Sequence, residues 1–533
     1  MDELNVMYIW NDTTMGGASQ SLLDMVKGIR NKVQPVVIMK EKNVMEEYLS
    51  ALGIKYYIVP FPRDQCLINT ATVGRAEQNF ADDYEAALKL IEIIHKENIR
   101  LIHINSSTGN VGAITALMMK IPYVWHIREF LEEDFGCEFL DKKLKGELFS
   151  RASTLVAISD CVQQSYIRKY QVTPVRIYNG IDINKFKKEL KSTIISKSIF
   201  LFAGMITPEK GQFDAIKAVE LMINRGYRDI RLNIVGDGRE NYVASLKKYV
   251  LERRLENNIR FFPFQKDLAN FREEATYSIT GSKYEALGRT TIEAMLAGNI
   301  VIGADTGGTR EIIGEAQERG YLYRQGDYKN LAEIMQKAME EPIDSKMKRR
   351  MYAQEYATVT FDLQNYCAEI ITLYENILNK KSNLSSDLFL FQLQKRYTEI
   401  ENKRYKRLEA TFGQTSQWLH IRQSGYSLSS YFENHNIKEI AIYGMAYLGW
   451  SLYNELKNSS IKISYVMDRN SGAVGDSLML INPDDELLPK VDAIVVTVVS
   501  QQEELVRWLK TRCSYCVIGL IEILNSVYAA IED

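Results

Sequence analysis

The sequence predicts an α/β protein with two facing Rossmann-like domains and a third, smaller Rossmann-like domain towards the C-terminus. Three observations support this fold class. Short apolar runs alternate with helical stretches over the first third of the chain, the alternation restarts after a polar segment at 185–197, and it begins a third time near Ile440. Such alternation is typical of parallel sheets covered by helices on both faces. A length of 533 residues is enough for about two to four domains.

The first domain is expected at residues 1–190. Its first apolar run ends at a loop that contains the glycine pair Gly16-Gly17, and a helix is expected from Ala18 to Ile29. The predicted strands are Val6–Trp10, Val36–Met39, Tyr56–Val59, Leu101–Ile104, Tyr123–His126 and Thr154–Ile158.

The second domain is expected at residues 191–360, after the polar segment at 185–197, which is interpreted as a linker. The predicted strands are Ile199–Ala203, Arg231–Val235, Ile259–Phe262, Tyr277–Thr280 and Ile300–Gly303. A long helix at 361–380 follows and can pack back on the first domain. Doubly wound domains bind ligands at the carboxyl ends of their strands, so a ligand is expected in the cleft between these two.

Residues 381–435 are polar and charged, and they are interpreted as a helical connector to a C-terminal domain at 436–533. The predicted strands of this domain are Ile440–Tyr443, Ile463–Met467, Ala493–Val499 and Cys516–Leu520. Gly444 and Gly449 resemble a dinucleotide-binding fingerprint whose middle glycine is Ala446, and Asp468 stands near the position of a ribose-binding acid. Similar modules are appended to some bacterial transferases. Two interpretations stay open, a non-catalytic interaction or regulatory module and a nucleotide-binding one.

Composition and charge restrict the partners. Lys plus Arg (66) nearly balances Asp plus Glu (68), so bulk charge gives no reason to expect nucleic acid. The N-terminal residues lack the pattern of a signal peptide, no run is apolar enough for a spanning helix, and six scattered cysteines fit a reducing cytoplasm. The basic, partly apolar stretch Asp141–Arg151 is a candidate for peripheral contact with the inner face of a membrane, or otherwise an ordinary solvated helix face.

The segment 282–308 carries the clearest sign of chemistry. Glu285 and Glu293 stand eight residues apart across a turn at Gly288, and a helix is expected directly after that turn. The first N–H groups of a helix and its dipole favour an anion. A phosphate at the helix N-terminus with carboxylates for hydroxyl groups on either side suits a sugar nucleotide.

Several segments, in order, are similar to those of the family-4 retaining glycosyltransferases, which have the two-domain fold called GT-B. They are Gly16–Ser19, Val124–Glu129, Leu155–Ser159, Ile177–Asp182, Phe202–Gly211, Val235–Gly238 and Glu285–Glu293. The resemblance covers about seven tenths of the chain and implies sugar transfer from a nucleoside diphosphate with retention of the anomeric configuration.

The resemblance also implies roles for individual residues. Glu285 is expected against the donor sugar, Glu293 on the ribose, and His126 near the anomeric carbon; Glu285 and His126 are the catalytic candidates. Arg128 and Glu129 are the candidates for acceptor contacts. The expected donor-binding residues are Gly16, Gly17, Lys210, Leu287, Gly288, Arg289, Thr290 and Glu293. Where the family commonly has an arginine for the diphosphate, this chain has Met205, and Arg289 is the candidate substitute.

The family's chemistry needs no cofactor, and the chain contains no Asp-x-Asp triplet, which glycosyltransferases of the other main fold use to hold a metal. The expected function is therefore metal-independent transfer of a hexose, from a UDP-sugar or else from GDP- or another nucleoside-diphosphate sugar. The expected acceptor is a surface polysaccharide, a lipid-linked glycan or a glycoprotein. The alternatives are a non-catalytic sugar-nucleotide-binding partner of another transferase and a bifunctional enzyme whose C-terminal domain modifies the sugar. A homo-oligomer or a partner protein bound through the C-terminal domain is also considered.

Overall fold

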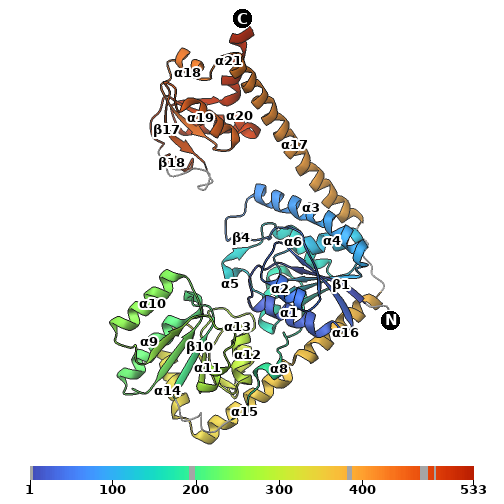
Figure 1. Ribbon diagram of the computed structural model, residues 1–533, viewed down its shortest axis with the longest axis vertical. Coiled ribbons are helices and arrows are strands. Elements are labelled where there is room, and N and C mark those ends of the chain that lie inside the picture. Colours follow the sequence, from blue (N-terminus) through green and yellow to red (C-terminus); the bar gives the residue numbers. More distant parts are fainter. Residues whose placement is uncertain (1–3, 191–197, 381–386, 469–477, 485–487, 533) are drawn as a thin grey trace. The chain divides into compact units, whose positions relative to one another are not determined.

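A computed structural model describes residues 4–190, 198–380, 387–468, 478–484 and 488–532. The chain forms two units, Met1–Leu393 and Gln394–Asp533. The first unit contains two parallel sheets and the second contains one, each with helices packed on it (Figure 1). The predicted fold class, α/β with three Rossmann-like sheets, is confirmed.

The first sheet has seven strands in the order β3-β2-β1-β5-β6-β8-β9, and all its pairs are parallel. Its last strand, β9, was not predicted, because it has only two residues and both are exposed. The strands are β1 (Leu4–Trp10), β2 (Val33–Met39), β3 (Lys55–Ile58), β5 (Leu101–Asn105), β6 (Tyr123–Ile127), β8 (Thr154–Ala157) and β9 (Val175–Arg176), and a separate antiparallel pair is formed by β4 (Cys66–Leu67) and β7 (Cys137–Glu138). The helices are α1 (Gly17–Ile29), α2 (Met45–Ala51), α3 (Val73–Glu97), α4 (Val111–Met119), α5 (Glu132–Phe135), α6 (Lys142–Ser150), α7 (Asp160–Tyr170) and α8 (Ile183–Phe186).

The second sheet has six parallel strands in the order β12-β11-β10-β13-β14-β15. The strands are β10 (Ile199–Ala203), β11 (Arg231–Val235), β12 (Ile259–Phe262), β13 (Tyr277–Thr280), β14 (Ile300–Ala304) and β15 (Gly320–Tyr323). The helical elements are the 3-10 turn η2 (Pro208–Lys210), α9 (Gln212–Asn224), α10 (Glu240–Glu252), α11 (Ala269–Glu274), α12 (Arg289–Leu296), α13 (Gly307–Ile313), α14 (Tyr328–Glu340), α15 (Ile343–Thr360) and α16 (Leu363–Asn379).

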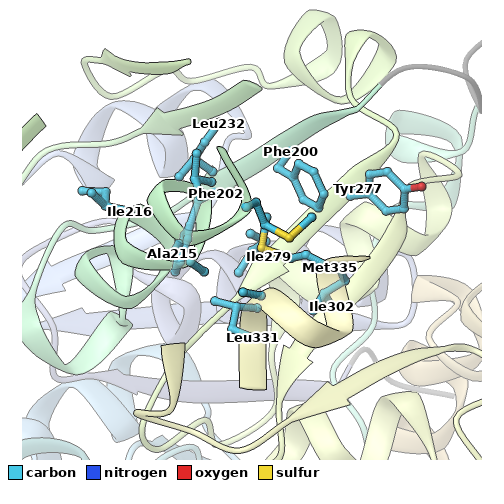
Figure 2. Close-up of a cluster of buried hydrophobic side chains, with 14 of the residues drawn as sticks. Phe200, Phe202, Ala215, Ile216, Leu232, Tyr277, Ile279, Ile302, Leu331 and Met335 are labelled. Carbon is cyan, nitrogen blue, oxygen red and sulfur yellow. The ribbon is translucent and has the colours of Figure 1, made fainter. Parts of the chain in front are cut away.

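A hydrophobic core holds the strands of the second sheet in place, including β10 and β13, whose carboxyl ends line the cavity described below. Figure 2 shows Phe200 and Phe202 of β10 and Ile279 of β13 packed with side chains of α9 and α14 such as Ile216 and Met335. Burying a large apolar side chain stabilises a fold by about 1.5–3 kcal/mol. The loops after β10 and β13 therefore start from firmly anchored strands.

Helix α16 follows the second sheet but packs on the first. Its Tyr366, Cys367 and Ile370 share a core with Met25 of α1 and Tyr8 of β1. The backbone N–H of Ile181 donates to the carbonyl oxygen of Phe361 at 2.7 Å, where the chain returns. The return of the chain at Phe361 and the packing of α16 thus tie the second part of this unit to the first.

Helix α6 covers most of the stretch that was considered for membrane contact. It turns Leu144, Leu148 and Phe149 into the core, and Lys145 is fully buried with its Nζ 3.2 Å from an oxygen of Asp64. Its apolar side chains are therefore not available to a membrane, and any peripheral contact through its exposed lysines Lys142 and Lys143 stays a prediction. The helices of the described ranges include none with the length and apolar character needed to cross a bilayer.

The second unit holds a five-stranded parallel sheet in the order β18-β17-β16-β19-β20. Its elements are α17 (Asp387–Gln423), α18 (Ser429–Asn434), β16 (Glu439–Tyr443), α19 (Tyr447–Leu456), β17 (Lys462–Met467), β18 (Leu480–Ile481), β19 (Ala493–Val496), the 3-10 turn η4 (Val499–Gln501), α20 (Gln502–Arg512), β20 (Cys516–Gly519) and α21 (Leu520–Glu532). Helix α17 starts within the first unit and supplies most of the expected connector.

Candidate functional site

A cavity of about 560 Å³ lies in the first unit, at the carboxyl ends of strands from both of its sheets. Its wall comes from the loop after β1, the residue after β6, the ends of β10, β11 and β13, and the start of α12. This size and position are typical of a small-molecule site in doubly wound folds.

The cavity wall contains ten of the twelve residues that the sequence placed in this site. They are Gly16, Gly17, Arg128, Lys210, Glu285, Leu287, Gly288, Arg289, Thr290 and Glu293. The two that do not line it are His126 and Glu129. The cavity is also lined by Asn179 of the segment Ile177–Asp182, to which no role was assigned, and by residues that no motif indicated, among them Gln20, Gln212 and Phe264.

Glu285 and Lys210 form an ordered polar group with Ser282. The Lys210 Nζ lies 3.2 Å from Oε2 of Glu285 and 3.1 Å from the Ser282 hydroxyl, which donates to the same carboxylate oxygen at 2.7 Å. This arrangement fixes a carboxylate that accepts hydroxyl hydrogen bonds beside a cation that can stabilise an anion.

The turn before α12 presents the first N–H groups of this helix to the cavity. Gly288 caps the helix with φ at +98°, a left-handed conformation that a side chain would strain. The first N–H groups of a helix have no partner within the helix, so they and the helix dipole favour a bound anion. Thr290 lines the cavity within this first turn.

Glu293 is held from behind by an arginine that the sequence did not indicate. The guanidinium of Arg272, on α11, lies 2.5 Å from Oε2 of Glu293 and is itself buried. The Nε of Arg289 lies 3.7 Å from the other carboxylate oxygen. The carboxylate of Glu293 therefore has a fixed orientation at the cavity wall.

Arg289 contacts the first domain. Its Nη1 donates to the Ser21 hydroxyl at 3.0 Å and its Nη2 lies 3.1 Å from the carboxylate of Asp24, both on α1. A Cβ atom on Gly17 would stand 3.8 Å from Cδ of Arg289, so this side chain also runs beside the glycine pair. Arg289 thus lines the cavity, but carboxylates from both sides already share its charge.

Met205 occupies the position where the family commonly has an arginine. Its side chain is 67% exposed and lines the cavity. The basic side chains that line the described cavity are those of Arg128, Lys210 and Arg289.

His126, which was expected near the anomeric carbon, does not line the cavity, and its role toward a substrate stays a prediction. The side chain is fully buried, with Nδ1 3.2 Å from His103 Nε2, and the phenol of Tyr374 on α16 lies 2.7 Å from His103 Nδ1. Burial, together with the nearby guanidinium of Arg128, lowers the pKa of His103 and His126 well below the usual range, so both imidazoles are neutral. His126 belongs to a buried polar network between β6 and α16.

Arg128 reaches the cavity because it follows the end of β6, whereas His126 lies within the strand. Its guanidinium donates to the side-chain oxygens of Asn105 and Asn179, the latter at 2.6 Å, and lies 3.3 Å from Nδ1 of His126. These contacts are with two amides and a neutral imidazole. The charge of Arg128 is thus oriented without being balanced by these partners.

Glu129 is buried behind the cavity and orders the loop after β5. It accepts hydrogen bonds from the Ser106 hydroxyl at 2.9 Å and from both N–H and hydroxyl of Ser107 at 2.6 Å. Burial raises the pKa of Glu129, although these donors oppose the effect. Ser106 has φ at +98°, a strained conformation that these contacts hold in place. Glu129 therefore supports this loop, and its expected acceptor contact stays a prediction.

Asp134 is an acidic group that the sequence did not indicate. It accepts from the Phe130 N–H at 2.9 Å. The pKa of Asp134 is raised to about 6, chiefly by burial and in smaller part by the carboxylates of Glu129 and Glu285, while the Phe130 N–H and Lys210 oppose the effect. This carboxyl group of α5 therefore senses charges of the second domain.

In the second unit, Gly444, Gly449 and Asp468 lie together at the carboxyl end of β16. Oδ2 of Asp468 accepts from the backbone N–H of Met445 at 2.8 Å. A Cβ atom on Gly449 would stand 2.0 Å from the carbonyl oxygen of Gly444, so close packing of α19 on the strand accounts for this glycine. The turn has the geometry of a dinucleotide fingerprint, and Asp468 is used to hold the turn.

Sequence models of two families match adjoining parts of the chain. The family described as glycosyltransferase family 4 matches residues 15–185, and the family described as glycosyl transferases group 1 matches residues 184–358. The boundary between the matches lies between the first and second sheets.

Individual proteins are similar over the same region. The Bacillus subtilis protein YtcC is 23% identical over 328 residues, which are 56% of this chain and 78% of YtcC. The capsular polysaccharide biosynthesis glycosyltransferase CapH of Staphylococcus aureus is 18% identical over 386 residues, 70% of this chain and 98% of CapH. The crystal structure of Anabaena HepE in complex with UDP-glucose has a TM-score of 0.57 and 23% identity, and the match covers 70% of this chain and all of HepE.

Proposed function

Because the chain belongs to the group 1 and family 4 glycosyltransferases, which retain the anomeric configuration of the sugar they transfer, we propose that it moves a hexose from a UDP-sugar to a growing surface glycan. The observation that carries this proposal is the polar group of Lys210, Ser282 and Glu285 opposite the N-terminus of α12, in one cavity between two Rossmann-like sheets. It offers acceptors for sugar hydroxyls beside donors for a diphosphate.

The donor is proposed to lie along the wall formed by the second domain. Glu285 accepts hydrogen bonds from the sugar hydroxyls, and Glu293, oriented by Arg272, accepts them from the ribose. The N–H groups at the start of α12 and the backbone at Gly16 and Gly17 surround the diphosphate. This assignment uses each carboxylate for hydroxyl recognition and neither as a nucleophile.

The transfer step needs stabilisation of the departing nucleoside diphosphate. The bond between the anomeric carbon and the phosphate oxygen breaks, negative charge grows on the diphosphate, and that oxygen takes the acceptor's proton on the same face while the new glycosidic bond forms. Lys210 and Arg128 are proposed to stabilise this growing charge. Arg128 is proposed to lie near the anomeric carbon, the position expected for His126. The buried His126 supports the Arg128 guanidinium through its Nδ1.

The donor and acceptor classes rest on relatives. HepE is described in complex with UDP-glucose, and CapH is named for capsular polysaccharide biosynthesis. We extend this to a UDP-hexose donor and a polysaccharide or lipid-linked acceptor assembled in the cytoplasm. The C-terminal domain is proposed to be a non-catalytic interaction or regulatory module, because its Gly449 and Asp468 are explained by local packing and turn contacts.

A donor screen tests the proposal. The purified full chain is incubated with UDP-glucose, UDP-galactose, UDP-N-acetylglucosamine and GDP-mannose, and release of the nucleoside diphosphate is measured with and without glycan acceptors. We expect turnover of a UDP-sugar that is lost in Glu285→Gln and Lys210→Ala. Release from none of the donors, with or without acceptor, contradicts the proposal. Donor binding without release under any condition identifies instead a sugar-nucleotide-binding partner of another transferase.

A further inference from the structure

Helix α17 exposes a row of large apolar side chains within the second unit. Tyr405, Leu408, Phe412 and Leu419 are 67%, 69%, 72% and 57% exposed. Single exposed apolar residues are common on protein surfaces, but these are separated by three, four and seven residues. With Thr415 between the last two, they occupy the a and d positions of a heptad repeat, the seam along which two helices pack in a coiled coil.

The intrachain packing of α17 uses a different side of the helix. The buried residues after the start of the second unit are Ile400, Gln414, Trp418 and Ile421, which fall on the c and g positions. Trp418 and Ile421 join the core of the C-terminal domain. The a/d row is therefore not needed for the packing of this domain.

The charges beside the row favour a second copy of the same helix. Arg404 stands at a g position and Glu409 at the following e position. In a parallel pair of helices, a g residue faces the next e residue of the partner, so Arg404 would meet Glu409 of the second copy twice by symmetry. The next such pair is Thr411 with Ser416, which is neutral. An antiparallel pair would place g opposite g and e opposite e, and within residues 401–419 these positions hold no residues of opposite charge for such contacts.

The same charges argue against a lipid surface as the binding partner of this apolar row. Helices that lie in anionic membranes carry basic residues beside the apolar face. Here Lys403, Lys406 and Arg407 stand at f, b and c positions, away from the seam, and Glu401 and Glu409 stand on or beside it. Arg404 is a basic residue beside the seam, but Glu401 and Glu409 outnumber it there, so anionic headgroups would repel this side of the helix.

We propose that α17 is a self-association surface, and that two copies of this chain form a parallel two-stranded coiled coil over residues 404–419, beyond Glu401, whose carboxylates would repel each other across the seam. Arg404 contacts Glu401 of its own helix in the single chain, and in the dimer it also contacts Glu409 of the second copy. Because the seam spans fewer than three heptads, the dimer is expected to form at micromolar concentrations and to dissociate on dilution. This inference is independent of the proposed transferase chemistry.

Light scattering coupled to size exclusion tests the surface. The full chain has a mass of 61.3 kDa, and we expect twice that mass at the highest concentrations and a fall towards 61.3 kDa on dilution. The double variant Leu408→Asp with Phe412→Asp is expected to stay at the mass of one chain with an unchanged unfolding temperature. Leu251→Asp, at a comparably exposed leucine on α10, is the matched control and should behave as the unaltered chain. A single-chain mass for the unaltered protein at every concentration overturns the proposal.

Charge reversal tests whether α17 pairs with a second copy of itself and whether the two helices run parallel. Arg404→Glu is expected to give single chains, and Arg404→Glu combined with Glu409→Arg to restore the dimer. Glu401→Gln removes the contact of Arg404 within its own helix and should leave the dimer intact. A combined variant that does not reassociate overturns the parallel arrangement. Co-sedimentation of the unaltered chain with phosphatidylcholine–phosphatidylglycerol vesicles, lost in the Leu408→Asp and Phe412→Asp variant, would assign the row to a membrane and overturn self-association.

Discussion

The contact between Arg289 and Asp24 predicts that a residue of the first domain controls donor binding in the second. The perturbation is Asp24→Asn, which removes the charge and keeps the size of the side chain. The guanidinium and carboxylate lie 3.1 Å apart, with 13% and 17% of their side-chain surfaces exposed. At that distance the attraction is about 5 kcal/mol for an effective dielectric constant near 20, and desolvation reduces the net effect to about 1–3 kcal/mol.

The loss of Asp24 is expected to turn Arg289 towards Glu293, the other carboxylate beside it. Arg289 would then leave the glycine pair at Gly17 and withdraw a carboxylate oxygen of Glu293 from the ribose. Both changes weaken donor binding, so the KM for the donor should rise about 10-fold, which corresponds to about 1.4 kcal/mol, while kcat changes less.

A double-mutant cycle in kcat/KM, measured by nucleoside diphosphate release, is the assay. If Asp24 acts through Arg289, the combination of Asp24→Asn with Arg289→Gln should lose no more than Arg289→Gln alone, a coupling of about 1–3 kcal/mol. Glu47→Gln, at an exposed acid on α2, is the matched control and should leave the donor KM unchanged. Additive losses, or a lower unfolding temperature with an unchanged KM, would refute the reasoning.

Three further predictions concern single residues. Met205→Arg should lower the donor KM about 10-fold, since a charge-assisted hydrogen bond contributes about 1.5–3 kcal/mol, and an unchanged KM would contradict a diphosphate at this wall. Arg128→Gln should lower kcat about 100–1,000-fold, whereas His126→Gln should lower the unfolding temperature and leave most of kcat; the reverse pattern would restore the direct role of His126. Asp134→Asn should stabilise the fold at high pH, because the pKa of this carboxyl is raised from 3.8 to about 6 in the folded state, chiefly by burial. Above pH 6 the ionised carboxylate therefore destabilises the folded state by up to about 3 kcal/mol. This penalty vanishes below the pKa of the carboxyl in the unfolded chain. Urea unfolding of the variant and the unaltered chain at about pH 8 and pH 4 measures this change in stability. A stabilisation that is equal at both pH values would contradict the raised pKa of Asp134.

The fold was predictable because its signal is periodic. Strands buried on both faces are continuous apolar runs, and all fifteen predicted runs overlap strands in the structure. The strands that were missed among the described residues are short: β4, β7, β9 and β18 have two residues each, and β15 has four residues and begins with a glycine. The C-terminal run expected to reach Val499 ends as a strand at Val496, because Thr497 turns its hydroxyl to the carbonyl oxygens of Tyr443 and Gly444.

The part of the candidate site that was predictable is formed by residues close together in the sequence. Glu285, Gly288 and Glu293 come from one loop and one helix, so their spacing alone places them together. The partners that orient them are far apart along the chain: Arg272 lies on α11 and Asp24 on α1. Such contacts depend on how helices pack, and no short spacing records them.

His126 shows a second limit of sequence reasoning. Alternation along β6 puts His126 and the residue two positions later on the same side, so it cannot distinguish which of them reaches the cavity. The answer depends on where the strand ends, at Ile127, and on α16, whose Tyr366 ring lies beside His126 and whose Tyr374 contacts the neighbouring His103. A helix that returns from a segment about 240 residues later thus decides which side chain lines the cavity.

The charges around the cavity indicate which group is most available to a diphosphate. Lys210 already lies beside Glu285, and Arg289 lies between Asp24 and Glu293, so an anion gains from either cation only by competing with a carboxylate. Arg128 differs because its contacts are with amide oxygens and a neutral imidazole. With Met205 in place of the family's arginine, the unbalanced charge at this site therefore comes from the first domain. Donor binding by the second domain should then depend on Arg128 across the cavity, which would couple occupancy of the donor site to the approach of the two domains.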